Sequence, residues 1–194
     1  MEELKEYAKK NLIPIVRDKT AEKLSNLVKQ EKPKRILEIG TAIGFSAILL
    51  LKSCDGNITT IEKNAERFNQ AKKNIEKYNL SSRATLVLGD ALESLKILAE
   101  KKERFDFIFL DGPKGQYINY YPYLKEMLSG GGILFTDNID LLGLIDSPEK
   151  VCHKNRAMVN HMKKYLETLE NDKSFKTEFY HIDDGFSISK KIAD

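Results

Sequence analysis

Three side chains with oxygen donors follow two apolar segments of this chain, at positions where they could bind one cation together. Asp111 comes directly after the apolar run 105–110, and the pair Asp137 and Asn138 comes directly after the run 132–136. Carboxylate and amide oxygens without a nearby histidine or cysteine favour Mg²⁺, or Mn²⁺ or Ca²⁺, over zinc. We therefore predict a divalent metal on these three residues; the alternative is ordinary turn chemistry, which Asp and Asn also favour.

A lysine lies close to the first of these carboxylates in the sequence. Lys114 is three residues after Asp111, so a turn can return its amine to the same place. Beside two positive centres, a lysine gives up its proton more easily and can then accept one from a hydroxyl group. We predict Lys114 as a catalytic base, with a solvated loop lysine as the alternative.

A turn with two glycines lies earlier in the chain, between an apolar strand-like segment and a helical one. Glu38 precedes Gly40, and Gly44 comes just before the helical stretch that contains Ser46. Such a turn lets backbone N–H groups approach a ligand. The spacing is not the G-x-G-x-x-G of dinucleotide-binding proteins, and an acid before the first glycine would repel a pyrophosphate. The pattern favours S-adenosylmethionine (SAM), which carries positive charge and whose carboxylate Ser46 could bind.

Two further acids follow the next two strand-like segments. Glu62 lies where a carboxylate can accept hydrogen bonds from both ribose hydroxyls of a nucleoside, and Asp90 follows the segment 84–88. Each has a simpler interpretation, Glu62 as a solvated carboxylate at a strand end and Asp90 as the cap of the next helix. For the whole site, the alternative class is an NAD-binding protein or a SAM-binding protein without catalysis.

The segments that must position these residues alternate between strand and helix patterns. We predict strands at 36–41, 57–62, 84–88, 105–110 and 132–136. Helices are expected at 45–53, 65–78, 91–101, 117–128 and 155–169. The segments 176–181 and 186–190 predict a terminal antiparallel hairpin. The fold class is therefore α/β, a parallel sheet with helices on both faces. In the usual strand order 3-2-1-4-5, the strands that precede Asp111 and Asp137 are neighbours.

The composition is that of an ordinary globular chain. Of its 194 residues, 41% are hydrophobic and 31% charged, and the net charge of +3 does not by itself indicate nucleic-acid binding. We predict one domain over 1–194 with a helical N-terminal cap at 1–31. No apolar run approaches the ~20 residues of a membrane span, and no signal peptide is recognisable. The distant cysteines Cys54 and Cys152 fit a reducing cytoplasm.

Together these motifs resemble those of class I SAM-dependent methyltransferases. The glycine turn, Glu62, the sequence Gly89-Asp90-Ala91 and the terminal hairpin carry that likeness. Asp-x-x-Lys-x-x-Tyr at 111–117 and Gly-Gly-x-x-x-x-Asp-Asn at 131–138 make the chain similar to the divalent-metal-dependent O-methyltransferases of the catechol and caffeoyl-CoA type. That family includes bacterial enzymes that methylate 5-hydroxyuridine in tRNA.

The resemblance implies a Rossmann-like fold whose seven-stranded, mostly parallel sheet ends in the antiparallel hairpin. It implies a cofactor site made of Glu38, Gly40, Gly44, Ser46, Glu62, Asp90, Ala91 and Asp111. It also gives Lys114 the role of the base and the metal to Asp111, Asp137 and Asn138. Tyr117 matches the tyrosine of the family motif, with either a functional or a packing role.

The methyl acceptor is the least determined part of the prediction. The small size and a basic cluster on the late helix, Lys154, Arg156, Lys163 and Lys164, favour 5-hydroxyuridine in tRNA, although a solvated charged face also explains that cluster. The alternative is a small catechol-like or caffeoyl-CoA-like acceptor. The insertion 139–153 contains an apolar stretch that could cover an aromatic ring or contact a second subunit, and we expect a homodimer.

Overall fold

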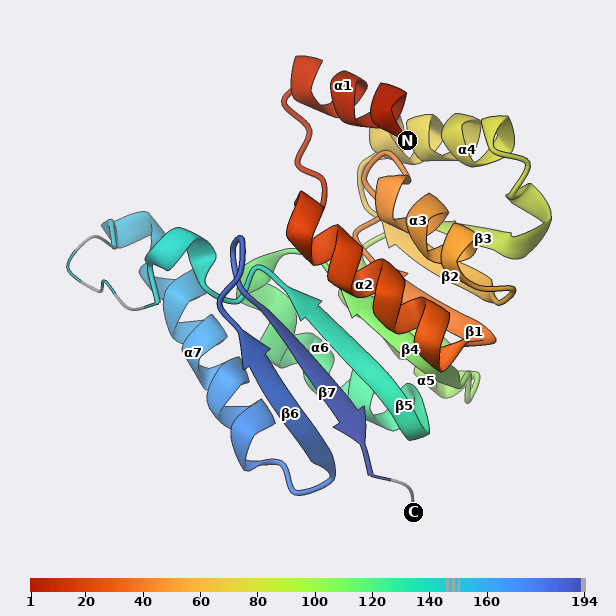
Figure 1. Ribbon diagram of the computed structural model, residues 1–194. Coiled ribbons are helices and arrows are strands. Elements are labelled where there is room, and N and C mark those ends of the chain that lie inside the picture. Colours follow the sequence, from red (N-terminus) through yellow and green to blue (C-terminus); the bar gives the residue numbers. More distant parts are fainter. Residues whose placement is uncertain (146, 148, 150, 193–194) are drawn as a thin grey trace. The chain divides into compact units, whose positions relative to one another are not determined.

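The computed structural model describes residues 1–145, 147, 149 and 151–192 (Figure 1). The chain divides into two compact parts, Met1–Ser94 and Leu95–Asp194. Seven strands form a mixed sheet in the order β3-β2-β1-β4-β5-β7-β6. This confirms the predicted α/β class and the order of the first five strands, whereas the single domain stays a prediction.

The first part begins with the two helices expected for the N-terminal cap, α1 (Glu2–Lys10) and α2 (Asp18–Glu31). Its strands are β1 (Arg35–Ile39), β2 (Asn57–Glu62) and β3 (Ala84–Leu88), and its other elements are α3 (Phe45–Ser53), α4 (Ala65–Lys77) and the short η1 (Ser81–Arg83). β2 pairs in parallel with both β1 and β3. The carboxyl ends of the three strands therefore lie at one edge of this part, which is where the predicted cofactor residues follow them.

Helix α3 is apolar on nearly all sides, as expected for a helix inside a core. Six of its nine residues are buried, among them Phe45, Ile48 and Leu51. It packs against α2, whose Leu24 and Val28 are fully buried. This packing fixes the N-terminal end of α3, and with it the glycine turn that leads into the helix.

After α5 (Ala91–Glu100), the second part contains the parallel strands β4 (Phe105–Leu110) and β5 (Leu128–Asp137). Between them lie η2 (Lys114–Gln116) and α6 (Tyr117–Met127). The short η3 (Leu141–Gly143) and η5 (His153–Asn155) precede α7 (Arg156–Asn171). β6 (Phe175–Tyr180) and β7 (Phe186–Lys191) form the predicted hairpin, with β7 antiparallel to β5. Figure 1 shows α6 and α7 side by side.

The main difference from the predicted boundaries is the start of β5. The sequence pattern ended the preceding helix at Leu128 and began the strand at Gly132, because a run of glycines is unusual inside a strand. In the structure Leu128 already pairs with Phe105, and a register shift between Phe105 and Phe107 absorbs the glycine-containing segment. The carboxyl end of β5, which carries Asp137, lies where it was predicted.

Candidate active site

The glycine turn holds a backbone conformation that requires its glycines. Gly40 and Gly44 have φ angles of 103° and 84°, in the left-handed region that residues with a Cβ rarely adopt. Gly44 is also the N-cap of α3, and the N–H groups of Gly40 and Thr41 donate to the carbonyl of Ile61 at 3.0 and 3.2 Å. The turn is therefore bound to the end of β2, with the start of a helix directly behind it.

Glu62 joins this turn to the loop after β2. One carboxylate oxygen accepts a hydrogen bond from the backbone N–H of Ala42 at 2.9 Å, and the other accepts one from the N–H of Asn64 at 2.8 Å. The side chain is nearly buried. Because each carboxylate oxygen can accept more than one hydrogen bond, Glu62 keeps acceptor capacity for a ligand. Its contact with a ribose stays a prediction.

Glu38 and Ser46 lie below the turn and behind it. Glu38 is fully buried in β1, where its carboxylate accepts a hydrogen bond from the hydroxyl of Thr60. Thr60 also shares a hydrogen bond of 2.5 Å with Thr41 of the turn. Ser46 is buried in the first turn of α3. The structure thus places both residues beside the turn, and their contacts with SAM stay predictions.

Asp90 has the simpler role that the sequence left open. One of its carboxylate oxygens accepts a hydrogen bond from the N–H of Leu92 at 3.0 Å, at the start of α5, and the other pairs with Lys63 at 3.0 Å. The hydrogen bond from Lys63 lowers the pKa of Asp90. Ala91, the first residue of α5, is buried. A capping aspartate can still contact an adenine, so the cofactor role of this pair also stays a prediction.

Asp111, directly after β4, and Asp137, at the end of β5, lie close enough for their negative charges to repel one another. Burial raises the pKa of Asp111 above its ordinary value, and Lys114 opposes this. Burial and the neighbouring Asp111 raise the pKa of Asp137 to about 7, against the opposing effects of Lys114 and the Asn138 N–H. The structure therefore gathers negative charge at this edge of the sheet that its own residues do not fully compensate.

Asn138 and Lys114 complete this group, which we call the strand-tip cluster (Asp111, Lys114, Asp137 and Asn138). The N–H of Asn138 donates to Asp137 at 2.8 Å, and its left-handed backbone, with φ of 58°, turns the chain directly after β5. Lys114 is the first residue of η2, and its ammonium donates to Asp111 at 2.6 Å. Asp111, Lys114 and Asp137 thus interact with one another in the second part of the chain, and Asn138 adjoins them through its backbone N–H.

Tyr117 connects the two strands that carry the cluster. Its ring is fully buried and lies edge-on to Tyr165, with centroids 5.6 Å apart. Its hydroxyl lies 3.4 Å from the carbonyl of Leu110, just before Asp111, and 3.3 Å from the carbonyl of Asp137, and can donate to both. The sequence left the role of Tyr117 open. Its position three residues after Lys114 matched the family motif, but the sequence did not predict that its hydroxyl connects the two strands.

The donor atoms of the strand-tip cluster fit a hard divalent cation. Two carboxylates and an amide offer oxygen ligands of the kind that Mg²⁺, Mn²⁺ and Ca²⁺ prefer. Within the part of the chain that the structure describes, no group of three or more His, Cys, Asp or Glu side chains is arranged for a metal. The predicted set has only two carboxylates, so it relies on Asn138 and on oxygens from outside the protein.

The insertion that follows Asn138 is anchored to the β6–β7 turn. The N–H of Ile139 donates to the carbonyl of Gly185 at 3.1 Å, and the N–H of Leu142 donates to the Asp184 carboxylate. His181, directly after β6, contacts Asp140 at 2.9 Å. Residues 146, 148 and 150 of the predicted insertion 139–153 lie outside the described residues.

Comparisons with known proteins identify the family. A model of the O-methyltransferase family matches residues 1–192. The chain belongs to this family. The family and the related structures with SAH support the predicted SAM-dependent O-methyltransferase over the alternative class of non-catalytic SAM-binding or NAD-binding proteins. Within the described residues, no helix combines the length and the apolar character that crossing a bilayer requires.

The similar proteins include two that are named as caffeoyl-CoA O-methyltransferases. It is similar to a caffeoyl-CoA O-methyltransferase of Stellaria longipes, 33% identical over 65% of this chain and 54% of that protein, so the chain spans about half of that relative's length. A provisionally named caffeoyl-CoA O-methyltransferase from Staphylococcus aureus is 33% identical, with a TM-score of 0.90 over 98% of this chain and 91% of that one. An O-methyltransferase from Bacillus cereus, solved with SAH, is 26% identical, with a TM-score of 0.88 over 98% and 89%.

Proposed function

We propose that this O-methyltransferase transfers the methyl group of SAM to a hydroxyl oxygen of a small catechol-like or caffeoyl-CoA-like acceptor, with a divalent metal on Asp111, Asp137 and Asn138. The observation that carries the metal assignment is the pair of strand-end carboxylates, the buried Asp137 and the partly exposed Asp111, whose pKa values are both raised. Burying two like charges together is unfavourable unless a cation joins them.

On the donor side, the glycine turn and Glu62 hold the cofactor. The N-terminal end of α3 offers backbone N–H groups and a partial positive charge to the SAM carboxylate, with Ser46 in its first turn. Glu62, fixed by two backbone N–H groups, accepts the ribose hydroxyls. Glu38 supplies a negative charge below the turn for the positively charged part of the cofactor.

On the acceptor side, Lys114 moves the proton. A bound Mg²⁺ would lower the pKa of an acceptor hydroxyl and fix its orientation. Lys114 takes up the hydroxyl proton at its Nζ, which donates a hydrogen bond to Asp111 at 2.6 Å in the structure. Asp111 therefore contacts the proposed base and is also a proposed metal ligand.

The choice of acceptor rests on the relatives. The sequence prediction favoured 5-hydroxyuridine in tRNA, whereas the named relatives include caffeoyl-CoA O-methyltransferases and a flavonoid 3',5'-methyltransferase. These names favour the small aromatic alternative. The basic cluster of η5 and α7 that supported tRNA contains exposed residues, among them Lys154, Arg156 and Lys164, as a solvated face would. A homodimer and a cytoplasmic location remain part of the proposal, the latter because Cys54 and Cys152 are both free.

The test is a methylation assay with purified protein, SAM and three acceptors: caffeoyl-CoA, a simple catechol, and tRNA that carries 5-hydroxyuridine. We expect product formation with at least one of the first two, complete loss of it with EDTA, and recovery with Mg²⁺. Activity that survives full removal of divalent metal would refute the metal role. Methylation of the tRNA alone would replace the small acceptor with the sequence's first choice.

A further inference from the structure

A cavity of about 290 Å³ lies in the first part of the chain, lined by four lysines and one acid. The charged residues around it are Lys29, Lys32, Lys34, Lys52 and Asp55. Such an excess of positive charge around one cavity indicates an anionic ligand. The proposed methylation does not use any of these residues.

This lysine cavity lies away from the glycine turn. It is formed where α2 ends, where β1 begins and where α3 ends, whereas the turn precedes the first residue of α3 and follows the last residue of β1. A helix with the nine residues of α3 is roughly 13 Å long. The cavity is therefore a separate site and not an extension of the cofactor site.

The walls of the cavity are held in place by hydrogen bonds and by one close backbone approach. The N–H of Asn57 donates to the carbonyl of Lys34 at 2.8 Å, and the hydroxyls of Ser25 and Ser53 share a hydrogen bond of 2.9 Å between α2 and α3. A Cβ on Gly56 would lie 2.2 Å from the carbonyl oxygen of Pro33, so only glycine allows this approach. The lysines thus project from fixed chain segments.

The lysines are not needed to neutralise the helix ends beside them, which is the usual reason for lysines at such positions. Arg83 already donates to the carbonyls of Leu51, Cys54 and Gly56 at the end of α3. At the end of α2, the carbonyl of Val28 accepts from the backbone N–H of Lys32.

Three of the ammonium groups are not bound to carboxylates. Lys29 and Lys32 have no ion pair among the described residues, and the Lys52 ammonium lies 4.3 Å from the centre of the Tyr78 ring. Lys32 also occupies a left-handed backbone position, with φ of 49°, where glycine would be favoured at a helix end. Positive charge therefore remains available to a ligand despite the presence of Asp55.

We propose that the lysine cavity binds a pyrophosphate group, such as that of a nucleoside di- or triphosphate. Lysine ammonium groups bind phosphate as point charges, and several of them around one cavity match adjacent phosphates better than a single carboxylate. The volume is at the lower end of the roughly 300–1,000 Å³ typical of ligand pockets, which suits a diphosphate better than a whole nucleotide. The nucleoside would then extend into solvent.

The test is calorimetric titration of the whole protein with inorganic pyrophosphate and with ATP, in metal-free buffer. The variant carries Lys29→Gln and Lys32→Gln, and the matched control carries Lys72→Gln and Lys73→Gln on α4, an equal loss of charge on exposed residues of the same part. We expect pyrophosphate and ATP to bind, with about tenfold or greater weakening in the cavity variant and little change in the control. SAM binding should be retained in both, which shows that they are folded.

A single-stranded RNA provides the third titration, because its backbone offers phosphates from a different source. RNA binding without pyrophosphate binding, or any binding that weakens equally in the two variants, would indicate general attraction to a basic surface and would overturn the cavity assignment. The absence of pyrophosphate binding to the unmodified protein would overturn it as well. Neither result bears on methylation, so this proposal and the proposed function fail separately.

Discussion

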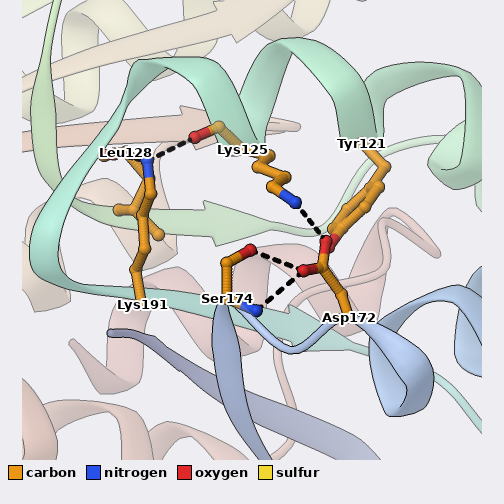
Figure 2. A network of polar contacts seen from close by, with 6 residues as sticks. All are labelled: Tyr121, Lys125, Leu128, Asp172, Ser174 and Lys191. Atoms are coloured by element: carbon orange, nitrogen blue, oxygen red, sulfur yellow. Dashed lines mark hydrogen bonds and ion pairs between the residues drawn. The ribbon is translucent and has the colours of Figure 1, made fainter. Parts of the chain in front are cut away.

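Two aspartates in the second part of the chain each form an ion pair with a lysine, yet their pKa values shift in opposite directions. Asp172 accepts hydrogen bonds from Lys125 at 2.5 Å, from Tyr121 at 2.6 Å, and from the hydroxyl and N–H of Ser174 (Figure 2). Burial raises the pKa of Asp172, but these donors outweigh it and hold the pKa well below its ordinary value. For Asp111, burial raises the pKa more than the ion pair with Lys114 lowers it, so the pKa lies above its ordinary value.

The difference separates a carboxylate whose charge is satisfied by protein donors from one that we propose as a metal ligand. Around Asp172, protein donors satisfy the charge, and the same network includes Lys191, which donates to the carbonyls of Lys125 and Leu128 at the end of α6 (Figure 2). In the strand-tip cluster, Lys114 is shared between Asp111 and Asp137, which repel one another. The Asp172 network therefore serves as an internal control for the proposed metal site.

The largest expected effect comes from replacing the lysine of either ion pair, Lys114 or Lys125, with methionine. Lys114→Met removes the proposed proton acceptor and should lower the rate of methyl transfer by about 100- to 10,000-fold. Lys125→Met should leave that rate nearly unchanged and lower stability by about 1 kcal/mol, since it removes one donor of Asp172. Steady-state kinetics and urea denaturation of both variants provide the measurement. Equal losses of activity in the two variants would remove the distinction between the sites.

Replacing either Asp137 or Asp172 with asparagine should separate the effects on metal affinity from those on stability. Asp137→Asn removes one of two like charges, so metal binding should weaken by about 100-fold or more, while stability in chelator should stay the same or rise. Asp172→Asn should do the reverse, with metal affinity retained and stability reduced by about 2 kcal/mol. Metal titration and denaturation of each variant measure the two quantities. A clear loss of stability in metal-free Asp137→Asn would mean that this carboxylate is structural.

The positions of the strand-tip residues were predictable from the local pattern, whereas their roles, which the family resemblance implied, stay predictions. An apolar run followed by Asp111, and another followed by Asp137 and Asn138, mark strand ends, and parallel strands present those ends at one edge of a sheet. The glycine turn was also predictable, because its two glycines lie between an apolar strand-like segment and an apolar helical one. The fold class and the order of the strands followed from the same alternation.

What the sequence could not provide are contacts between distant residues. The hydrogen bond from Tyr121 to Asp172 spans 51 residues, and the bridge from Tyr117 to Asp137 spans 20, without any periodicity to mark either. The pair of His181 and Asp140 was missed for the same reason. The predicted start of β5 was wrong. Leu128 pairs with Phe105, and this pairing outweighs the weak strand preference of the glycines that follow Leu128.

The two sites should also produce opposite pH dependences of stability in chelator. The folded pKa of Asp172 lies below its unfolded value of about 3.9, so its stabilisation is complete above that pH and is lost as the pH falls further. Asp137 has a folded pKa of about 7. Because it stays protonated in the folded state while the unfolded chain ionises, stability should fall as the pH rises from about 4 to about 7.

Urea denaturation at a series of pH values gives a plot of stability against pH. In this plot we expect an acidic limb from Asp172 and a second limb between about pH 4 and 7. Asp172→Asn should flatten the acidic limb alone, and Asp137→Asn should reduce only the limb between about pH 4 and 7, where the raised pKa of Asp111 leaves a smaller contribution. The unmodified protein with excess Mg²⁺ should also lose the second limb, since metal binding favours the ionised carboxylate. If the second limb were unchanged in Asp137→Asn, the raised pKa would have to be assigned to another group.

The smallest effect is expected from two tyrosines that each lose only a hydroxyl. Tyr117→Phe keeps the ring packed against Tyr165 but removes the donor that lies between the carbonyls of Leu110 and Asp137. It should cost about 1 kcal/mol of stability and weaken metal binding, because the two strand ends that carry the ligands lose their bridge. Tyr121→Phe removes a donor of Asp172 and should cost a similar amount without changing metal affinity. Paired denaturation and metal titrations of both variants distinguish the roles: if Tyr117→Phe weakened metal binding no more than Tyr121→Phe does, the bridge would be ordinary packing, and the strand-tip cluster would keep its geometry without it.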